Sequence, residues 1–252
     1  MRTVILPDSR AVGQLVAAEA SAALNQALAR QPRARLLLAT GASQFDVLAS
    51  LVRQPVDWER VDAFHLDEYE GLDAGHPASF RRYLKERVAD LVPLNMHYVG
   101  PDDARELERL STLVVQAPFD VALVGVGENG HLAFNDPPAD LTAQSVYLRV
   151  DLDERCRRQQ VGEGWFATLD EVPRRAVSMS VQAILRSRHI LCSVPYEAKS
   201  EVVLRLLSTE EVTPWLPASA LLDHPGTTLF LDRASSRRLP RALWQRCVLM
   251  GL

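Results

Sequence analysis

The sequence predicts an α/β fold: a single doubly wound, mostly parallel β-sheet with helices on both faces, Rossmann-like in architecture. Two observations lead to this prediction. Short apolar runs alternate with longer helical patterns, and polar or glycine-rich segments follow the runs. Such alternation is typical of parallel β-α-β units. The chain shows no repeat or linker that would divide it, so residues 1–252 are predicted to form one domain.

The predicted strands are short and nearly all apolar, as expected when both faces of a strand are buried. They are residues 36–39, 61–66, 121–124 and 189–194. Other stretches carry apolar side chains at helical spacing, as at Val12, Val16, Ala20 and Leu24. The predicted helices are residues 9–30, 43–53, 77–90, 102–116 and 196–207.

Composition excludes several classes of protein. Lysine and arginine number 28 against 32 acidic residues, whereas a protein that coats nucleic acid usually has a basic face. No apolar run approaches the ~20 residues of a membrane span, and residues 1–8 have too short an apolar core for a secretory signal. The three cysteines include no C-x-x-C pair, which favours a reducing compartment. We therefore expect a cytoplasmic protein with no nucleic-acid or membrane partner.

Parallel sheets of this class bind ligands beyond the carboxyl ends of their strands. One turn there, formed by Thr40, Gly41, Ala42 and Ser43, follows a predicted strand and opens a helix. Free backbone N–H groups and a helix dipole favour an anion at such a turn, and Lys199 would add positive charge. The alternatives are that Ser43 simply caps its helix and that Lys199 is a solvated surface lysine.

Asp67 and Glu68 also follow a predicted strand. A partly desolvated carboxylate has a raised pKa and can act as a general base on carbon next to a carbonyl. The alternative is that the two acids start a helix, where the dipole favours them.

A glycine-rich loop supplies the third candidate. Gly125, Gly127 and Gly130 match the dinucleotide fingerprint, but Pro137 and Pro138 follow too soon for the helix that this fingerprint requires. We instead expect a loop whose backbone approaches a small ligand.

The same loop contains His131, which Asn129 and Asp136 are placed to orient. An imidazole near a carboxylate suits proton transfer near neutral pH; the alternative is a structural histidine. The histidines show no metal-ligand spacing, so we predict no metal site.

These residues together resemble the glucosamine-6-phosphate deaminase family, within the larger group that includes 6-phosphogluconolactonases. The resemblance covers roughly residues 1–235. Residues 38–43 (LATGAS) resemble its phosphate loop, residues 66–79 (LDEYEGL followed by HPAS) one signature, and residues 127–137 (GENGHLAFNDP) another.

The resemblance implies amino sugar catabolism, a part of carbohydrate metabolism: isomerisation and hydrolytic deamination of glucosamine 6-phosphate to fructose 6-phosphate and ammonia, without a cofactor. Asp67 would move the proton between C2 and C1 of the open-chain sugar. His131, helped by Asn129 and Asp136, would open the sugar ring. The turn at residues 40–43 and Lys199 would hold the phosphate.

Two departures from the family pattern are visible. The family's usual glutamate is Asp136 here, and Asn129 replaces an aspartate found in some members. The resemblance also assigns a mobile lid to residues 151–173. Arg155, Arg157 and Arg158 of that segment are candidates to clamp the phosphate, with a solvated basic helix face as the alternative.

Two other functions stay open at this stage: a lactonase acting on a phosphorylated sugar acid, and a non-catalytic sugar-phosphate-binding protein. Lactonases of this fold usually run G-H-T-A-S-L where this chain has GHLAFN at residues 130–135, which favours a deaminase. The stereochemistry of the sugar and assembly into a homo-oligomer also stay open.

Overall fold

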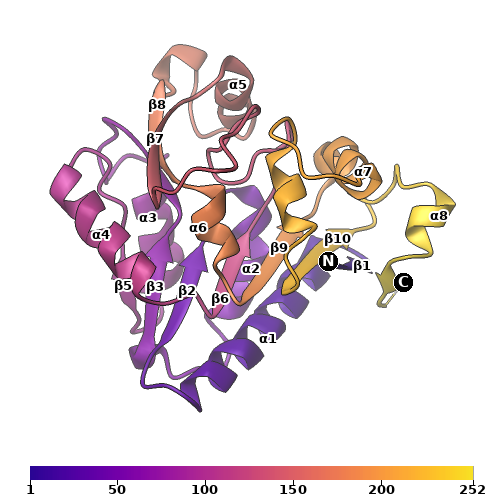
Figure 1. Ribbon diagram of the computed structural model, residues 1–252, viewed down its shortest axis with the longest axis horizontal. Helices are drawn as coiled ribbons and strands as arrows, with labels where there is room; N and C mark the ends of the chain where they lie inside the picture. Colours follow the sequence, from indigo (N-terminus) through magenta and orange to yellow (C-terminus); the bar gives the residue numbers. More distant parts are fainter. Residues whose placement is uncertain (252) are drawn as a thin grey trace.

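An eight-stranded sheet, parallel throughout, forms the centre of the molecule (Figure 1). In the computed structural model, which describes residues 1–251, the strand order is β11-β1-β10-β9-β6-β2-β3-β5. These strands are β1 (Arg2–Leu6), β2 (Ala34–Leu38), β3 (Val61–His65), β5 (Asn95–His97), β6 (Val121–Val124), β9 (His189–Val194), β10 (Thr227–Asp232) and β11 (Val248–Leu249). The predicted fold class is confirmed.

The four predicted strands are β2, β3, β6 and β9, and they are neighbours in the sheet. Their side chains point alternately to two apolar layers. Leu36 and Leu38 pack with α1 (Ser9–Leu28) and α2 (Phe45–Leu51). Leu37 packs on the opposite face with α4 (Ala104–Gln116), α6 (Val181–Leu185) and α7 (Ser200–Ser208). Burial on both faces explains why the strands are uniformly apolar.

The helices begin where side chains satisfy their first backbone N–H groups. The Asp8 carboxylate accepts a hydrogen bond of 2.8 Å from Ala11 N at the start of α1, and Asp103 caps α4 in the same way. The predicted helix at 77–90 starts later: α3 (Phe80–Leu84) is capped by Ser79 and continues as a π-helix (Lys85–Ala89). The remaining helices are α5 (Glu154–Gly162), α8 (Arg241–Trp244) and the 3₁₀ turns η1 (Ala42–Gln44), η2 (Trp58–Arg60), η4 (Leu169–Glu171), η5 (Glu197–Lys199) and η6 (Pro217–Leu221).

A second, antiparallel sheet of three strands was not foreseen. Its order is β4 (Asp67–Tyr69), β8 (Arg175–Met179) and β7 (Tyr147–Asp151). With α5 it lies at one end of the molecule, at the top of Figure 1. The alternative in which Asp67 and Glu68 start a helix is therefore wrong: the backbone of β4 pairs with β8, more than 100 residues later.

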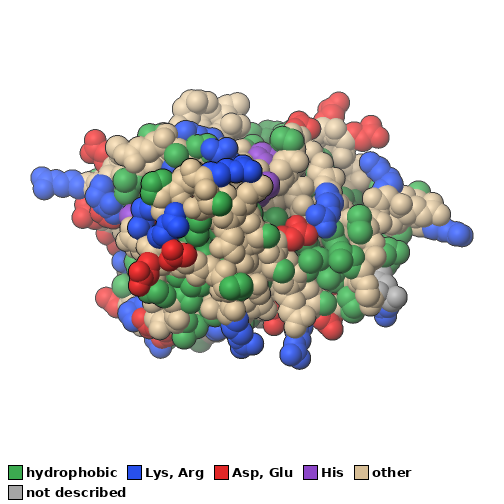
Figure 2. All heavy atoms as spheres, turned by 90° about the horizontal axis from the view of Figure 1, so that it is seen from below, with side chains coloured by type: hydrophobic (Ala, Val, Ile, Leu, Met, Phe, Trp, Pro, Cys, Tyr) green, Lys and Arg blue, Asp and Glu red, His purple; other side chains and the backbone are tan. Residues whose placement is uncertain are grey.

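The surface and the loop after β6 have the following features. Acidic and basic side chains are interspersed on the face shown in Figure 2. Between residues 125 and 146 the described chain forms turns and no helix, which confirms the predicted loop in place of the helix that a dinucleotide fingerprint requires. Within residues 1–251, no helix is both long and apolar enough to cross a membrane.

Candidate active site

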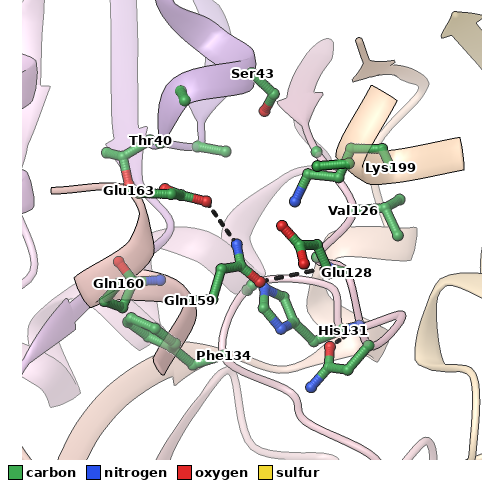
Figure 3. A pocket seen from close by; sticks show the side chains of 18 of the residues that line it. Thr40, Ser43, Val126, Glu128, His131, Phe134, Gln159, Gln160, Glu163 and Lys199 are labelled. Carbon is green, nitrogen blue, oxygen red and sulfur yellow. Dashed lines mark hydrogen bonds between the residues drawn. The ribbon is translucent and has the colours of Figure 1, made fainter. Parts of the chain in front are cut away.

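A cavity of about 550 Å³ opens at the carboxyl ends of four neighbouring strands, β3, β2, β6 and β9 (Figure 3). From β2 the chain proceeds outward to β3, whereas from β6 it proceeds to β9 on the other side. The crevice between β2 and β6 is thus a topological switch point, the expected ligand site in such sheets. The residues predicted from sequence that line this cavity are Thr40, Gly41, Ala42, Ser43, Asp67, Asn129, His131, Arg155, Arg158 and Lys199.

The turn after β2 is fastened by its carbonyl groups. Gly41 has φ +92°, a conformation that favours glycine. The Tyr83 hydroxyl donates to Gly41 O at 3.1 Å, and the Tyr196 hydroxyl donates to Ala42 O at 3.4 Å. The backbone N–H groups of residues 40–43 donate no hydrogen bond within residues 1–251, so they are available to a ligand in the cavity, as an anion-binding turn requires.

Lys199 extends into the cavity from η5, after β9 (Figure 3). Its side chain is largely buried, and burial lowers its pKa, while Glu163 and Glu128 act in the opposite direction. The alternative of a solvated surface lysine is wrong, because the residue is only 8% exposed.

Asp67 lies in β4 with its side chain at the cavity. Burial, with a contribution from the charge of Glu68, raises its pKa from 3.8 to about 8. A carboxyl group with this pKa both accepts and returns a proton near neutral pH, which is what general acid–base chemistry needs.

Glu68 points away from Asp67 into the protein and is fully buried. It accepts hydrogen bonds from Ser79 Oγ (2.8 Å), Phe80 N (3.3 Å) and Arg81 N (2.9 Å) and forms an ion pair with Arg81. The Glu68 carboxylate therefore lies at a helix N-terminus, but the helix is α3 and not one that starts at Glu68 itself. It anchors β4 to α3 and so fixes the position of Asp67.

His131 is oriented by a short network within the glycine loop. Its Nδ1 lies 3.1 Å from Asp136 Oδ1, which also accepts a bond of 2.8 Å from Asn129 Nδ2. Asn129 Oδ1 accepts a bond of 3.0 Å from His131 N. Donation from Nδ1 to Asp136 leaves Nε2 as the nitrogen free to exchange a proton; this tautomer is assigned from the network.

Asp136 is charged in this network. Burial opposes its ionisation, but the hydrogen bond and charge of His131, with the bond from Asn129, outweigh that effect and hold the pKa of Asp136 below its usual value. Asp136 does not line the cavity itself and acts through the histidine.

Gly127 makes room for the imidazole. A Cβ atom there would lie 2.2 Å from Cε1 and Nε2 of His131. The ring therefore packs directly on the backbone, which explains why the loop needs glycine at this point.

The candidate lid contributes α5 to the cavity wall. Arg155 and Arg158 line the cavity, whereas Arg157 donates to the Val172 carbonyl at 3.3 Å and braces the lid itself. Arg157 is thus not placed to clamp a phosphate. The resemblance did not identify the polar groups beside these arginines.

Gln159 and Glu163 are two such groups. Gln159 Nε2 donates to Glu163 Oε1 at 2.7 Å, and Gln159 Oε1 accepts from Glu128 N at 3.4 Å (Figure 3). Trp165 Nε1 donates to Glu163 Oε2 at 3.1 Å. Gln159 thereby links the lid helix to the glycine loop. Nothing in a helical pattern distinguishes these residues from a solvated face.

A buried carboxyl, a histidine paired with a carboxylate and a buried lysine share one cavity at the switch point of a parallel sheet. This combination defines the class: an α/β enzyme of acid–base chemistry. The chain belongs to the family described as glucosamine-6-phosphate isomerases/6-phosphogluconolactonase, whose model matches residues 7–230.

Individual relatives agree with this assignment. A glucosamine-6-phosphate deaminase of Bacillus pumilus is 32% identical over 92% of this chain and 98% of its own length. One of Streptomyces avermitilis is 31% identical over 100% of this chain and 97% of its own. The solved structure of a monomeric glucosamine-6-phosphate deaminase covers 94% of this chain and 99% of its own, with a TM-score of 0.85 and 27% identity.

A 6-phosphogluconolactonase from Thermotoga maritima shares the fold at lower similarity. Its TM-score is 0.70 at 21% identity, over 92% of this chain and 99% of its own.

Proposed function

We propose that this chain is a glucosamine-6-phosphate deaminase that converts its substrate to fructose 6-phosphate and ammonia. The observation that carries the proposal is that Asp67 and His131 line one cavity together with an anion-binding turn and Lys199. Proton transfer at two different substrate positions needs two acid–base groups, here Asp67 and His131. A phosphate bound at the turn would hold the sugar within reach of both.

The phosphate binds to the amide groups of residues 40–43, with Lys199 as counter-charge. Arg155 and Arg158 add charge from the lid segment, residues 151–173. The substrate's ammonium group is accommodated by the carboxylates that share the cavity, Glu128 and Glu163. A zwitterionic sugar phosphate thus finds partners for both of its charges.

Ring opening comes first. Nε2 of His131 takes the proton of the C1 hydroxyl and gives a proton to the ring oxygen, so that the C1–O5 bond breaks and an aldehyde forms. Asp136 stays ionised and stabilises the imidazolium that forms in passing. Asn129 keeps Asp136 in place.

Isomerisation and deamination follow. Asp67 removes the proton from C2 while the aldehyde oxygen at C1 takes a proton from the substrate's ammonium group, which gives an enolamine. Asp67 then returns its proton to C1, which gives an iminium at C2. Water adds to C2 and ammonia leaves, so that the ketone of fructose 6-phosphate remains. Because Asp67 is buried with a pKa of about 8, it serves both as base and as conjugate acid.

The lid proposal has a packing rationale. Phe166, Leu152 and Val172 pack with Tyr69 and Phe80 in a small cluster separate from the two layers on the main sheet. Gly162 and Gly164 lie at the end of α5, and a Cβ at either would meet no atom within 4 Å. These glycines suit hinge positions.

We further propose that the enzyme acts in the cytoplasm. Its cysteines Cys156, Cys192 and Cys247 are all free thiols, and free thiols persist in a reducing compartment.

The proposal is tested by incubating the purified chain with glucosamine 6-phosphate and measuring ammonia and fructose 6-phosphate together. We expect both in equal amounts, and none from Asp67→Asn. Galactosamine 6-phosphate in the same assay tests the stereochemistry. Hydrolysis of 6-phosphogluconolactone without ammonia release would identify a lactonase, and thermal stabilisation by glucosamine 6-phosphate without turnover would identify a binding protein.

A further inference from the structure

We propose that His131, Asp136 and Cys156 form a binding site for one thiophilic divalent metal ion, of which Zn²⁺ is the type, and that the bound ion inhibits the enzyme. The inhibitory part rests on the proposed function; the metal site does not. The three side chains offer a nitrogen, a carboxylate oxygen and a sulfur, all within 4.8 Å of one another. This mixed set of donors suits zinc.

The donor atoms lie within 4.8 Å of one another, so a tetrahedral ion would draw the widest pair together by up to about 1 Å. Zinc bonds of about 2.0–2.3 Å place neighbouring ligand atoms roughly 3.4–3.7 Å apart. His131 Nδ1 and Asp136 Oδ1 lie 3.1 Å apart and would separate by a few tenths of an ångström to admit the ion. Spacing along the sequence did not reveal the site because Cys156 is 20 residues from Asp136 in the chain.

The Asp136 side chain provides a second observation that points to a cation. Its side chain is only 9% exposed, and its Oδ2 atom is buried without any hydrogen-bond partner among residues 1–251. A buried acceptor without a partner costs free energy. A metal ion beside Cys156 and His131 would satisfy that oxygen.

The ligands come from two elements that meet at the cavity. His131 and Asp136 belong to the glycine loop, and Cys156 lies in the first turn of α5, where its N–H donates to Asp153 Oδ1 at 2.6 Å. The ion would tie the candidate lid to the loop. Because His131 also lines the cavity, water from the cavity can take the fourth coordination position, as in zinc sites with three protein ligands.

Binding requires a defined exchange of protons. The Cys156 thiol releases its proton to solvent and its sulfur binds as thiolate, with no change in oxidation state. The neutral imidazole binds through Nδ1 and carries its proton on Nε2, so that the hydrogen bond to Asp136 is replaced by two bonds to the ion. With Nε2 protonated and the ring fixed by the metal, His131 no longer accepts the C1 hydroxyl proton.

The site is tested on the metal-free full-length chain by titration with Zn²⁺ in a calorimeter and with Co²⁺ in a spectrophotometer. We expect one ion per chain and a thiolate-to-cobalt charge-transfer band. Cys156→Ser should weaken Zn²⁺ binding at least tenfold and abolish the band. Cys247→Ser, which removes a half-buried thiol in the C-terminal region, is the matched control and should change neither.

A second variant covers the case in which Cys156→Ser does not fold. Asp136→Asn keeps the thiol, so it should retain a charge-transfer band while its Zn²⁺ affinity falls at least tenfold. Equal affinity in the wild type and in Cys156→Ser, or loss of the band in Cys247→Ser, would overturn the site.

Inhibition is measured separately, as ammonia release with and without Zn²⁺. We expect Zn²⁺ to inhibit the wild type and to leave Cys156→Ser active. Equal inhibition of both chains, or bound Zn²⁺ without inhibition, would refute the inhibitory role. No ammonia release in metal-free buffer would instead refute the proposed function, and the binding experiments would still decide on the site.

Discussion

Burial of Asp67 should make the enzyme less stable as the pH rises. The unfolded chain has a pKa near 3.8 for this carboxyl, and the folded protein has one near 8. Between these values the native state binds more protons than the unfolded state, so the free energy of unfolding falls with increasing pH. Each pH unit is worth about 1.4 kcal/mol. From pH 5 to pH 8 the loss attributable to Asp67 is at most about 4 kcal/mol.

The variant that isolates this effect is Asp67→Asn, which keeps the shape of the side chain and cannot ionise. Urea unfolding of the wild type and the variant at several pH values between 5 and 8 gives the difference in the free energy of unfolding. We expect the free energy of unfolding of the variant, relative to that of the wild type, to increase steadily with pH. At pH 8 the variant should be the more stable protein, although it has lost turnover. Removing a catalytic group that destabilises the fold commonly raises stability in this way.

The matched control is Asp170→Asn in η4, since Asp170 is exposed. Its difference from the wild type should not vary with pH. Parallel stability curves for the wild type and Asp67→Asn would refute the reasoning, because they would mean that folding leaves the proton affinity of Asp67 unchanged.

Three further predictions concern catalysis. Because Asp67 must be ionised to remove the C2 proton, kcat/KM for glucosamine 6-phosphate should rise about tenfold per pH unit up to about pH 8; a flat profile between pH 6 and 8 would contradict this role. His131→Gln should slow turnover of the closed ring about 100-fold or more and spare an open-chain analogue, and equal losses on both would remove its ring-opening role. Gly127→Ala should cost activity severely because its Cβ meets the His131 ring at 2.2 Å. Gly100→Ala is the control: it lies outside the cavity lining, its Cβ would meet only the Glu106 side chain, at 3.4 Å, and it should retain activity; steady-state rates of the two variants compare them directly.

Four strands of the main sheet were predictable because nearly every residue in them is buried. β2, β3, β6 and β9 are covered on both faces, so a short run of apolar residues is enough to identify each of them in the sequence. Their adjacency follows from the connection rules of parallel sheets, and with it the meeting of the turn after β2 and the glycine loop after β6. A Cβ at Gly125 would lie 2.7 Å from Ser43 Oγ, which shows how closely these two loops approach.

Features that depend on distant partners were not predictable in this way. β4 has three residues, and its strand character comes from pairing with β8; locally its two acids fit a helix start equally well. Glu68 carries a carboxyl group like its neighbour Asp67, and only the burial of Glu68 against α3 shows that it anchors the strand while Asp67 faces the cavity. The contact of Cys156 with Asp136 depends on where α5 lies, which no periodicity encodes.

The place of β1 in the sheet has a consequence for folding. One edge of this strand pairs with β10, which begins at Thr227, and the other with β11, which begins at Val248. The earliest strand in the chain therefore completes its backbone pairing only through segments made more than 200 residues later. Closing so large a loop is slow. Until then α1 can cover only the face of β1 that carries Val4, and Ile5, in the opposite layer, stays open to contact with other chains.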